Sequence, residues 1–345
     1  MFRQPERVTP DQNRRPDSQS GARRQARFRP RLFLRMQPGA GKSAGKDEGG
    51  RMGWFNKLFQ GAPSAPSNKR GIEELARRME MDVAALGAIE PRYYEQSIPK
   101  RSGGRRQLLV PADDLKAVQR TLLRKVLGRL PAHEAVHGFR KGRSIVTNAR
   151  PHMGRAAVLR MDIQDFFPST DADRVLRYFQ AIDWDPVASG LMARLTTHKG
   201  GLPQGAPTSP WLANIVNYQM DQRLASIAKL FDALYTRYAD DMTFSFTDGL
   251  RAEIAGVIQC VQDALVDYGY KLHTKKKLRL ARRHQRMVVT GLVVNEGVRL
   301  PRETRRKLRA ARHHVATGKP ATWTEAQLKG WEAFESMVMA WADGE

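Results

Sequence analysis

Cysteine is almost absent from this sequence, because Cys260 is the only one among 345 residues. This excludes a disulfide framework and a zinc site built from several cysteines. No apolar run approaches the roughly 20 residues that a membrane-spanning helix needs. The first 30 residues also lack the apolar core of a secretory signal. We therefore expect a cytoplasmic protein without a membrane partner.

Acidic residues are scarce: 35 Asp and Glu oppose 59 Lys and Arg, which gives a net charge of +24. The excess lies in residues 1–70, at +11, and in residues 271–320, at +14, whereas the remainder is close to neutral. Such a charge predicts a polyanionic partner and favours nucleic acid. Residues 1–70 are rich in Gly, Pro, Gln and Ser without apolar periodicity. They are predicted to form a disordered basic tail, either a solvated arm or a non-specific nucleic-acid arm.

Hydrophobic periodicity predicts an α+β fold built on an antiparallel sheet. Strands are expected over 156–163 and 288–294, and a hairpin over 234–246 with Ala239-Asp240-Asp241 as its turn. The expected helices are 71–88, 115–130, 171–182, 208–230, 254–268, a basic helix over 302–315, and an aromatic-rich segment over 323–341.

Three aspartates are the strongest chemical signal in the sequence. Asp162 lies in a strand that is otherwise predicted to be buried, and Asp240 and Asp241 occupy the hairpin turn. Buried carboxylates are usually paired or bind a metal, so neighbouring strands would bring these three to one sheet edge. Carboxylates without His or Cys suit Mg²⁺, with Mn²⁺ as the alternative, and two such ions support phosphoryl transfer. A structural Ca²⁺ site is the competing interpretation.

Several motifs resemble those of reverse transcriptases. Tyr238-Ala239-Asp240-Asp241 looks like the YxDD signature, residues 162–169 resemble the first palm motif, and residues 201–210 resemble the LPQG-type second motif. Residues 98–106 look like the basic fingers motif. Two further stretches are similar to motifs of the bacterial retron type, namely residues 137–152, which end in Asn148-Ala149-Arg150-Pro151-His152, and Val289-Thr290-Gly291.

The resemblance, which runs from about residue 72 to about residue 314, implies a right-hand polymerase fold. It has fingers, a palm built on an antiparallel sheet and a short helical thumb, preceded by the disordered basic N-terminal tail. The expected domains are the tail at 1–70, N-terminal helices and fingers at 71–155, the palm at 156–295 and the thumb at 296–345.

The resemblance also implies roles for individual residues. Asp162, Asp240 and Asp241 would bind two Mg²⁺ ions (or Mn²⁺), assisted by the backbone carbonyl of Ile163. The expected nucleotide contacts are Lys100 or Arg101 and Arg106 at the triphosphate, Phe167 excluding a ribose 2′-hydroxyl, Gln204 against the nucleotide, and Lys276 near the pyrophosphate. The expected RNA contacts are Asn148, His152, Val289, Thr290, Gly291, Arg305, Arg306 and Arg309. For His152, a core histidine is the alternative; for the basic hairpin and Gln204, it is ordinary solvated surface.

The implied function is that of a retron-type RNA-directed DNA polymerase. It would copy a structured non-coding RNA into single-stranded DNA, using dNTPs, and join the product to the RNA as branched msDNA, in antiphage defence. A second hypothesis is another bacterial reverse transcriptase lineage, group II intron-like or of a phage-defence type. A third is a catalytically inactive RNA-binding scaffold. The sequence does not identify an effector protein.

Overall fold

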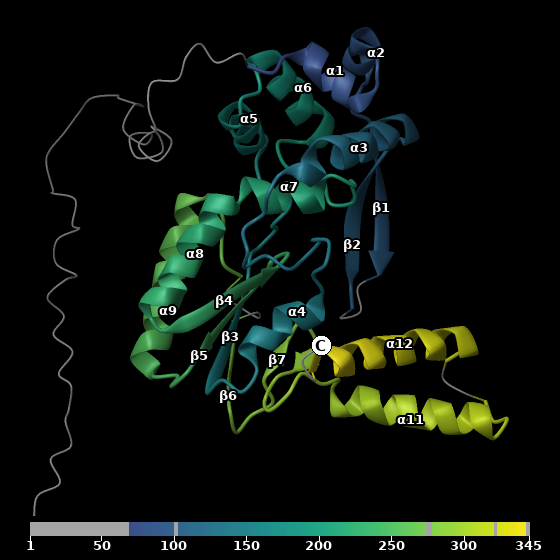
Figure 1. The fold of residues 1–345 in the computed structure, drawn as a ribbon, viewed down its shortest axis with the longest axis vertical. Coiled ribbons are helices and arrows are strands. Elements are labelled where there is room, and N and C mark those ends of the chain that lie inside the picture. The colour runs from purple at the N-terminus through teal and green to yellow at the C-terminus, as the bar shows by residue number, and fades with distance from the viewer. Residues whose placement is uncertain (1–68, 100–102, 274–277, 321–322, 343–345) are drawn as a thin grey trace, which may run out of the picture. The chain divides into compact units, whose positions relative to one another are not determined.

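The structure, a computed structural model, describes residues 69–99, 103–273, 278–320 and 323–342. The predicted basic tail therefore lies almost entirely outside the described residues. Within them, no helix combines the length and apolarity required to cross a membrane. The structure confirms a mixed fold of helices and antiparallel sheets (Figure 1).

A four-stranded antiparallel sheet organises the fold, in the order β4-β5-β3-β6. Its strands are β3 (Ala157–Asp162), β4 (Ala233–Tyr238), β5 (Asp241–Phe246) and β6 (Arg279–Arg282). The predicted hairpin is confirmed as β4 and β5, and β3 pairs with β5 so that Asp162 lies opposite Asp241. The pairing of β3 with β5 brings segments about 80 residues apart in sequence next to each other.

The two faces of this sheet differ in chemistry because side chains alternate along each strand. One face is apolar, with Leu159, Met161, Met242 and Phe244 buried in the main core. Helices α8 (Tyr218–Leu230) and α9 (Arg251–Asp267) contribute the other side of this core. The opposite face is more polar and ends in the aspartates.

The expected single helix over residues 208–230 is wrong, because it is two helices. α7 (Ser209–Val216) ends at Asn217, and α8 begins at Tyr218. The Asn217 side chain is fully buried and donates to the Ala213 carbonyl and to the Tyr270 hydroxyl. A buried asparagine with local and tertiary hydrogen bonds competes with helix continuation, a conflict that periodicity does not register.

The expected helix over 71–88 is also two helices, since Glu80 adopts a left-handed conformation with φ of 56°. A two-stranded sheet follows, and its two strands pair over their full length. The elements of this part are α1 (Ile72–Met79), α2 (Val83–Ala88), β1 (Tyr93–Pro99), β2 (Arg105–Pro111), α3 (Asp113–Lys125), η2 (Leu127–Arg129), α5 (Ala172–Ala181) and α6 (Pro186–Thr196).

A second hydrophobic cluster joins the C-terminal helices to the polar face of the sheet. It includes Val158 of β3, Val146, Leu308 and Val338. The predicted strand over 288–294 is wrong: Thr290 and Gly291 have φ of 45° and 87° and turn the chain into a short hairpin. The elements are α4 (Ile145–Ala149), η3 (Arg150–His152), β7 (Val288–Val289), β8 (Leu292–Val293), α11 (Arg302–Ala316) and α12 (Glu325–Ala342).

Candidate active site

The three aspartates lie at the same end of the four-stranded sheet. Asp162 ends β3 directly opposite Asp241, the first residue of β5, and Asp240 precedes it in the turn. Two backbone hydrogen bonds fix this end: the Ile163 N–H donates to the Asp240 carbonyl at 2.9 Å, and the His273 N–H donates to the Asp162 carbonyl at 2.8 Å. All three aspartates are half-buried. The backbone therefore brings carboxylates from two distant segments to one edge.

An arginine also belongs to this edge. Arg160 lies two residues before Asp162, on the same face of β3, and its guanidinium forms an ion pair with Asp241. Its Nε lies 3.3 Å from Asp241 Oδ1. Both side chains are at least three-quarters buried, so the pair is better shielded from water than a surface ion pair. Sequence reasoning missed Arg160, although a charge inside a buried strand is a usable signal.

The donor set fits a hard divalent cation by its chemistry, since it consists of carboxylate oxygens without nitrogen or sulfur ligands. The described part of the chain nevertheless contains no group of three or more His, Cys, Asp or Glu side chains already converged to hold a metal. Asp241 is engaged by Arg160 instead. The edge thus supplies carboxylate ligands, one of which is already paired with an arginine.

The turn between β4 and β5 is tightly packed against its surroundings at Ala239. Ala239 has a left-handed backbone with φ of 57°, and its carbonyl accepts a 2.9 Å hydrogen bond from Arg237 Nη1. Gly138 lies so close to the turn that a Cβ there would be 2.8 Å from the Ala239 nitrogen. The turn is therefore held by a side chain on one side and by a closely approaching backbone on the other.

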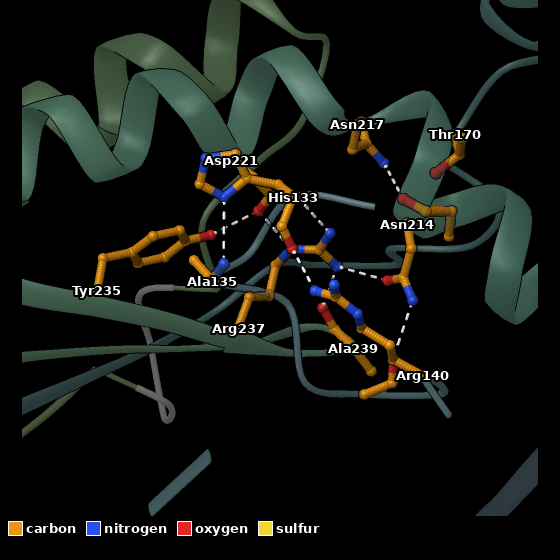
Figure 2. A network of polar contacts seen from close by, with 12 residues as sticks. His133, Ala135, Arg140, Thr170, Asn214, Asn217, Asp221, Tyr235, Arg237 and Ala239 are labelled. Carbon is orange, nitrogen blue, oxygen red and sulfur yellow. Dashed lines mark hydrogen bonds and ion pairs between the residues drawn. The ribbon is translucent and has the colours of Figure 1, made fainter. Parts of the chain in front are cut away.

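Arg237 is fully buried and pairs with the fully buried Asp221 of α8. Nε and Nη2 donate to the two carboxylate oxygens of Asp221 at 2.7 and 2.6 Å, and the Tyr235 hydroxyl donates to Oδ1 at 2.8 Å (Figure 2). Burial alone would lower the pKa of Arg237, but Asp221 outweighs it and raises that pKa above its ordinary value. Burial and Asp221 together raise the pKa of Tyr235.

This buried pair connects α7, α8 and the loop at residues 133–140 to the turn. The Arg237 N–H donates to the Ala135 carbonyl at 2.8 Å, and the Arg237 carbonyl accepts from the His137 N–H at 2.9 Å. Asn214 of α7 donates to the Gly138 carbonyl at 2.8 Å. Sequence reasoning also missed Arg237 and Asp221. The available signal was an arginine on the core-facing side of a predicted strand, which must have a buried partner.

The predicted nucleotide contacts lie on three different segments. Arg106 is exposed near the start of β2, opposite Ile98 of β1. Phe167 is half-buried, with its ring 5.6 Å from that of Phe166. Gln204 is half-buried, and its carbonyl accepts a 2.7 Å hydrogen bond from the Leu109 N–H of β2. Lys100, Arg101 and Lys276 lie outside the described residues.

Gly205 explains how the loop at residues 201–210 docks on β2. Its φ is 130°, and a Cβ at this position would lie 2.8 Å from the Leu109 carbonyl oxygen. Only glycine combines this backbone conformation with so close an approach. The docking ties Gln204 to the same hairpin that carries Arg106.

Asn148 and His152, which we predicted to contact RNA, are both fully buried. The His152 ring bonds the hydroxyls of Ser245 and Thr236 at 2.7 Å each, on the polar face of the sheet. Burial, and then the nearby His137 and Arg155, lower the pKa of His152 to about 3, so the ring is neutral near neutral pH. Both side chains lie away from solvent, and this burial fits the alternative of a core histidine for His152. The RNA contact itself stays a prediction.

The Val289-Thr290-Gly291 segment forms the tip of the β7–β8 hairpin. Val289 is buried in the second cluster, and the Thr290 hydroxyl donates to the Ile145 carbonyl at 3.0 Å. Gly291 is exposed. The segment therefore packs the hairpin against α4, the helix that carries Asn148, with Thr290 half-buried and Gly291 exposed.

Helix α11 separates its arginines into two groups. Arg312 bonds Glu332 and Glu335 of α12 at 2.8 and 2.7 Å and thereby ties the two helices together. Arg305, Arg306 and Arg309 are exposed, whereas Leu308 and Ala311 are buried against α12. The described residues offer these three arginines no ion-pair partner. They form an exposed basic stripe.

Comparison with known proteins identifies the family. Residues 98–293 match the family model described as Reverse transcriptase (RNA-dependent DNA polymerase), and this span covers more than half of the chain. The chain is 33% identical to the Retron Ec86 reverse transcriptase of Escherichia coli over 246 residues, which cover 70% of this chain and 75% of that protein. The chain belongs to the retron-type reverse transcriptases.

Two relatives from Myxococcus xanthus agree with this assignment. The chain is 40% identical to the Retron Mx162 reverse transcriptase over 280 residues and 37% identical to the Retron Mx65 reverse transcriptase over 269 residues. Each match covers 71% of this chain, but only 58% and 61% of the relatives' lengths. The chain thus spans about three fifths of the length of these two retron reverse transcriptases.

Proposed function

We propose that this protein is an RNA-directed DNA polymerase that copies a structured non-coding RNA into single-stranded DNA. The observation that carries the proposal is the meeting of Asp162 with Asp240 and Asp241 at one sheet end, in a chain of the retron-type family. The three belong to the sequence motifs that, by resemblance, carry the catalytic carboxylates of this family.

According to this proposal, the fold consists of the fingers, palm and thumb of a right-hand polymerase. The four-stranded sheet with α8 and α9 is the palm, over residues 156–295. The β1–β2 hairpin and the surrounding helices are fingers, over residues 71–155. Helices α11 and α12 are the thumb, over residues 296–345. Residues 1–70 are the basic tail, for which we propose an accessory nucleic-acid arm.

Asp162, Asp240 and Asp241, assisted by the Ile163 carbonyl, would hold two Mg²⁺ ions, or Mn²⁺. When bound, such ions activate the attacking hydroxyl and neutralise charge on the leaving pyrophosphate. The protein's own contribution is to keep the three carboxylates at one edge. The Arg237 side chain does this through the Ala239 carbonyl, and the Ile163 N–H through the Asp240 carbonyl. Arg160 offsets the negative charge of Asp241 at this edge.

The incoming deoxynucleotide would lie between the palm and the β1–β2 hairpin. We propose that its triphosphate is bound by Lys100 or Arg101, by Arg106 and by Lys276. Gln204 would lie against the incoming nucleotide. Phe167 would exclude a ribose 2′-hydroxyl by its bulk. The backbone bond between Leu109 and Gln204 supports this assignment because it couples the hairpin to the loop that carries Gln204.

The exposed stripe Arg305, Arg306 and Arg309 would grip the template–primer duplex. Cationic side chains without protein partners are suited to phosphates, and counterion release makes their contribution strongly dependent on salt. For Asn148, His152, Val289 and Thr290 we propose an indirect role, in which they set the position of α4 and of the hairpin tip at Gly291. We further propose that the DNA is joined to the RNA as branched msDNA and acts in antiphage defence.

The test is DNA synthesis by the purified protein on an RNA template with an annealed primer, Mg²⁺ and dNTPs. We expect template-length DNA from dNTPs and little product from ribonucleotides. The variant Phe167→Ala should accept ribonucleotides more readily, whereas the matched variant Phe231→Ala, on the far end of α8, should not. Absence of DNA product from a folded protein that binds the template would refute the proposal and favour an RNA-binding scaffold.

A further inference from the structure

A large aromatic side chain next to the Tyr238–Asp241 turn is about half exposed to solvent. Phe139 has 49% of its surface exposed, although it belongs to a loop whose neighbours Val136, His137 and Gly138 are buried. Its ring centroid lies 6.4 Å from that of Phe167 and 6.2 Å from that of Tyr238. The three rings form an aromatic patch, defined here as Phe139, Phe167 and Tyr238, directly beside the proposed catalytic edge.

The conformation of Phe139 is strained. Its φ is 58°, in the left-handed region that bulky residues rarely adopt because it is energetically unfavourable for them. Backbone strain of this kind is found most often at functional sites. An ordinary loop would place glycine or asparagine at such a position. Here about half of an apolar ring remains exposed, so hydrophobic burial within the chain accounts for only part of the conformation.

The fold fixes this loop on both sides of Phe139. Asn214 donates to the Gly138 carbonyl at 2.8 Å, and Arg140 Nη1 donates to the His133 carbonyl at 3.2 Å. His137, two residues earlier, donates its N–H to the Arg237 carbonyl at 2.9 Å and so joins the network around Arg237. The ring is therefore held in a defined place relative to the turn, as a recognition contact requires.

Three cationic residues that follow Phe139 in the sequence indicate what it contacts. Lys141 and Arg143 are exposed, and Arg140 is half-buried. An exposed aromatic ring among cationic side chains is the arrangement by which proteins bind nucleotides, because the ring covers a base or sugar while the cations meet phosphates. An acidic peptide would satisfy the cations but would not require a ring beside the catalytic turn.

We propose that Phe139 is a nucleobase contact that holds a nucleotide at the growing end of the nucleic acid. This inference rests on the proposed polymerase function and deepens it by naming a residue that positions the substrate. The nucleotide can come from two sources, the template–primer duplex or the incoming dNTP. Both present the same chemistry, an aromatic base with an adjacent phosphate.

The first experiment measures binding without catalysis. Fluorescence anisotropy with a labelled RNA template annealed to a DNA primer gives the dissociation constant, and dNTP binding to this complex is measured in a second arm. Phe139→Asn removes the ring and suits the left-handed backbone, so thermal unfolding should be unchanged or improved. We expect roughly tenfold weaker binding in at least one arm, and near wild-type binding for Phe139→Tyr. Val266→Asn, at an exposed apolar site on α9, is the matched control.

The second experiment locates the contact. Single 5-iodouracil bases are placed along the primer and the template, or supplied as the iodinated dUTP, and irradiated on the enzyme. We expect a cross-link to the peptide that contains Phe139 from one of these sources, which identifies the nucleotide. Equal affinities of Phe139→Asn and wild type in both arms, together with cross-links elsewhere, would overturn the inference. Failure of the wild-type protein to bind the duplex would instead count against the proposed function.

Discussion

Replacing Arg237 with methionine should show how much the proposed catalytic turn at Ala239, Asp240 and Asp241 depends on the buried ion pair between Arg237 and Asp221. Methionine fills a similar volume but leaves the Asp221 carboxylate buried without its cation. Removal of one partner from a buried pair costs about 3–5 kcal/mol. That is a large share of the roughly 5–15 kcal/mol that stabilises a typical domain. Urea unfolding, followed by tryptophan fluorescence, should report this loss directly.

A triple variant separates stability from positioning. Arg237→Met combined with Asp221→Leu and Tyr235→Phe removes the whole buried network, so no charge or hydroxyl remains without a partner. Apolar replacement of a buried pair is often neutral or stabilising, and most of the lost free energy of unfolding should return. The Ala239 carbonyl, however, still lacks the Arg237 donor that fixes the turn.

We therefore expect the triple variant to be about as stable as the wild type but to add nucleotides slowly. A misplacement of about 1 Å at a catalytic group can cost about 100-fold in rate, so kcat for single-nucleotide addition should fall by about that factor. The template–primer dissociation constant should be nearly unchanged. The reasoning is refuted if Arg237→Met costs less than about 1 kcal/mol, or if the triple variant recovers both stability and kcat.

Three further predictions concern the sheet, the loop on β2 and the basic helix. Because burial lowers the pKa of His152 from 6.5 to about 3, the unfolded chain binds the extra proton below pH 6.5, and stability should fall as the pH drops towards 3. The protonation of His152 in the unfolded chain should lower the free energy of unfolding by about 2 kcal/mol between pH 7 and pH 5. Urea titrations of His152→Gln should show a smaller loss over this pH range, and an unchanged loss would contradict the interpretation. Gly205→Ala should lower the free energy of unfolding by about 1–3 kcal/mol in thermal unfolding, because the added Cβ would meet the Leu109 carbonyl. The control Gly190→Ala, which has open space inside α6, should stabilise the protein. Equal effects of the two substitutions would contradict the docking of this loop on β2. Replacing the exposed stripe Arg305, Arg306 and Arg309 by glutamine should reduce the slope of log affinity against log salt by about 2–3, whereas Arg312→Gln should lower stability and leave the slope unchanged.

The sequence predicted best where local patterning and tertiary packing agree. The hairpin of β4 and β5 alternates strictly and carries its turn residues in the middle, so local preference alone places Asp240 and Asp241. The meeting with Asp162 followed from the expectation that a carboxylate in an apolar strand needs a partner or a cation. Pairing of β3 with β5 fulfils that expectation for the backbone.

The sequence predicted poorly where a single residue breaks a pattern for tertiary reasons. Asn217 ends α7 because its side chain is committed to Ala213 and Tyr270, and Thr290 and Gly291 fold an apparent strand into a hairpin. The roles of Arg160 and Arg237 were not predicted, because a charged residue in a strand can be assigned a role only when its ion-pair partner is known. For His152, the resemblance of its motif predicts an RNA contact, whereas its burial and its hydrogen bonds to Thr236 and Ser245 follow from tertiary packing that the sequence does not reveal.

The central claim is that the Asp162, Asp240 and Asp241 edge performs DNA synthesis. Its most direct test is the single-turnover rate constant for adding one deoxynucleotide to an RNA-templated primer, measured for wild type, Asp162→Asn and Asp241→Asn. Asparagine keeps the shape and removes the charge, so we expect each rate constant to fall by at least about 1,000-fold. Asp248→Asn, at an exposed position after β5, should retain the wild-type value. Folded Asp162→Asn and Asp241→Asn variants that add nucleotides at the wild-type rate would contradict the account.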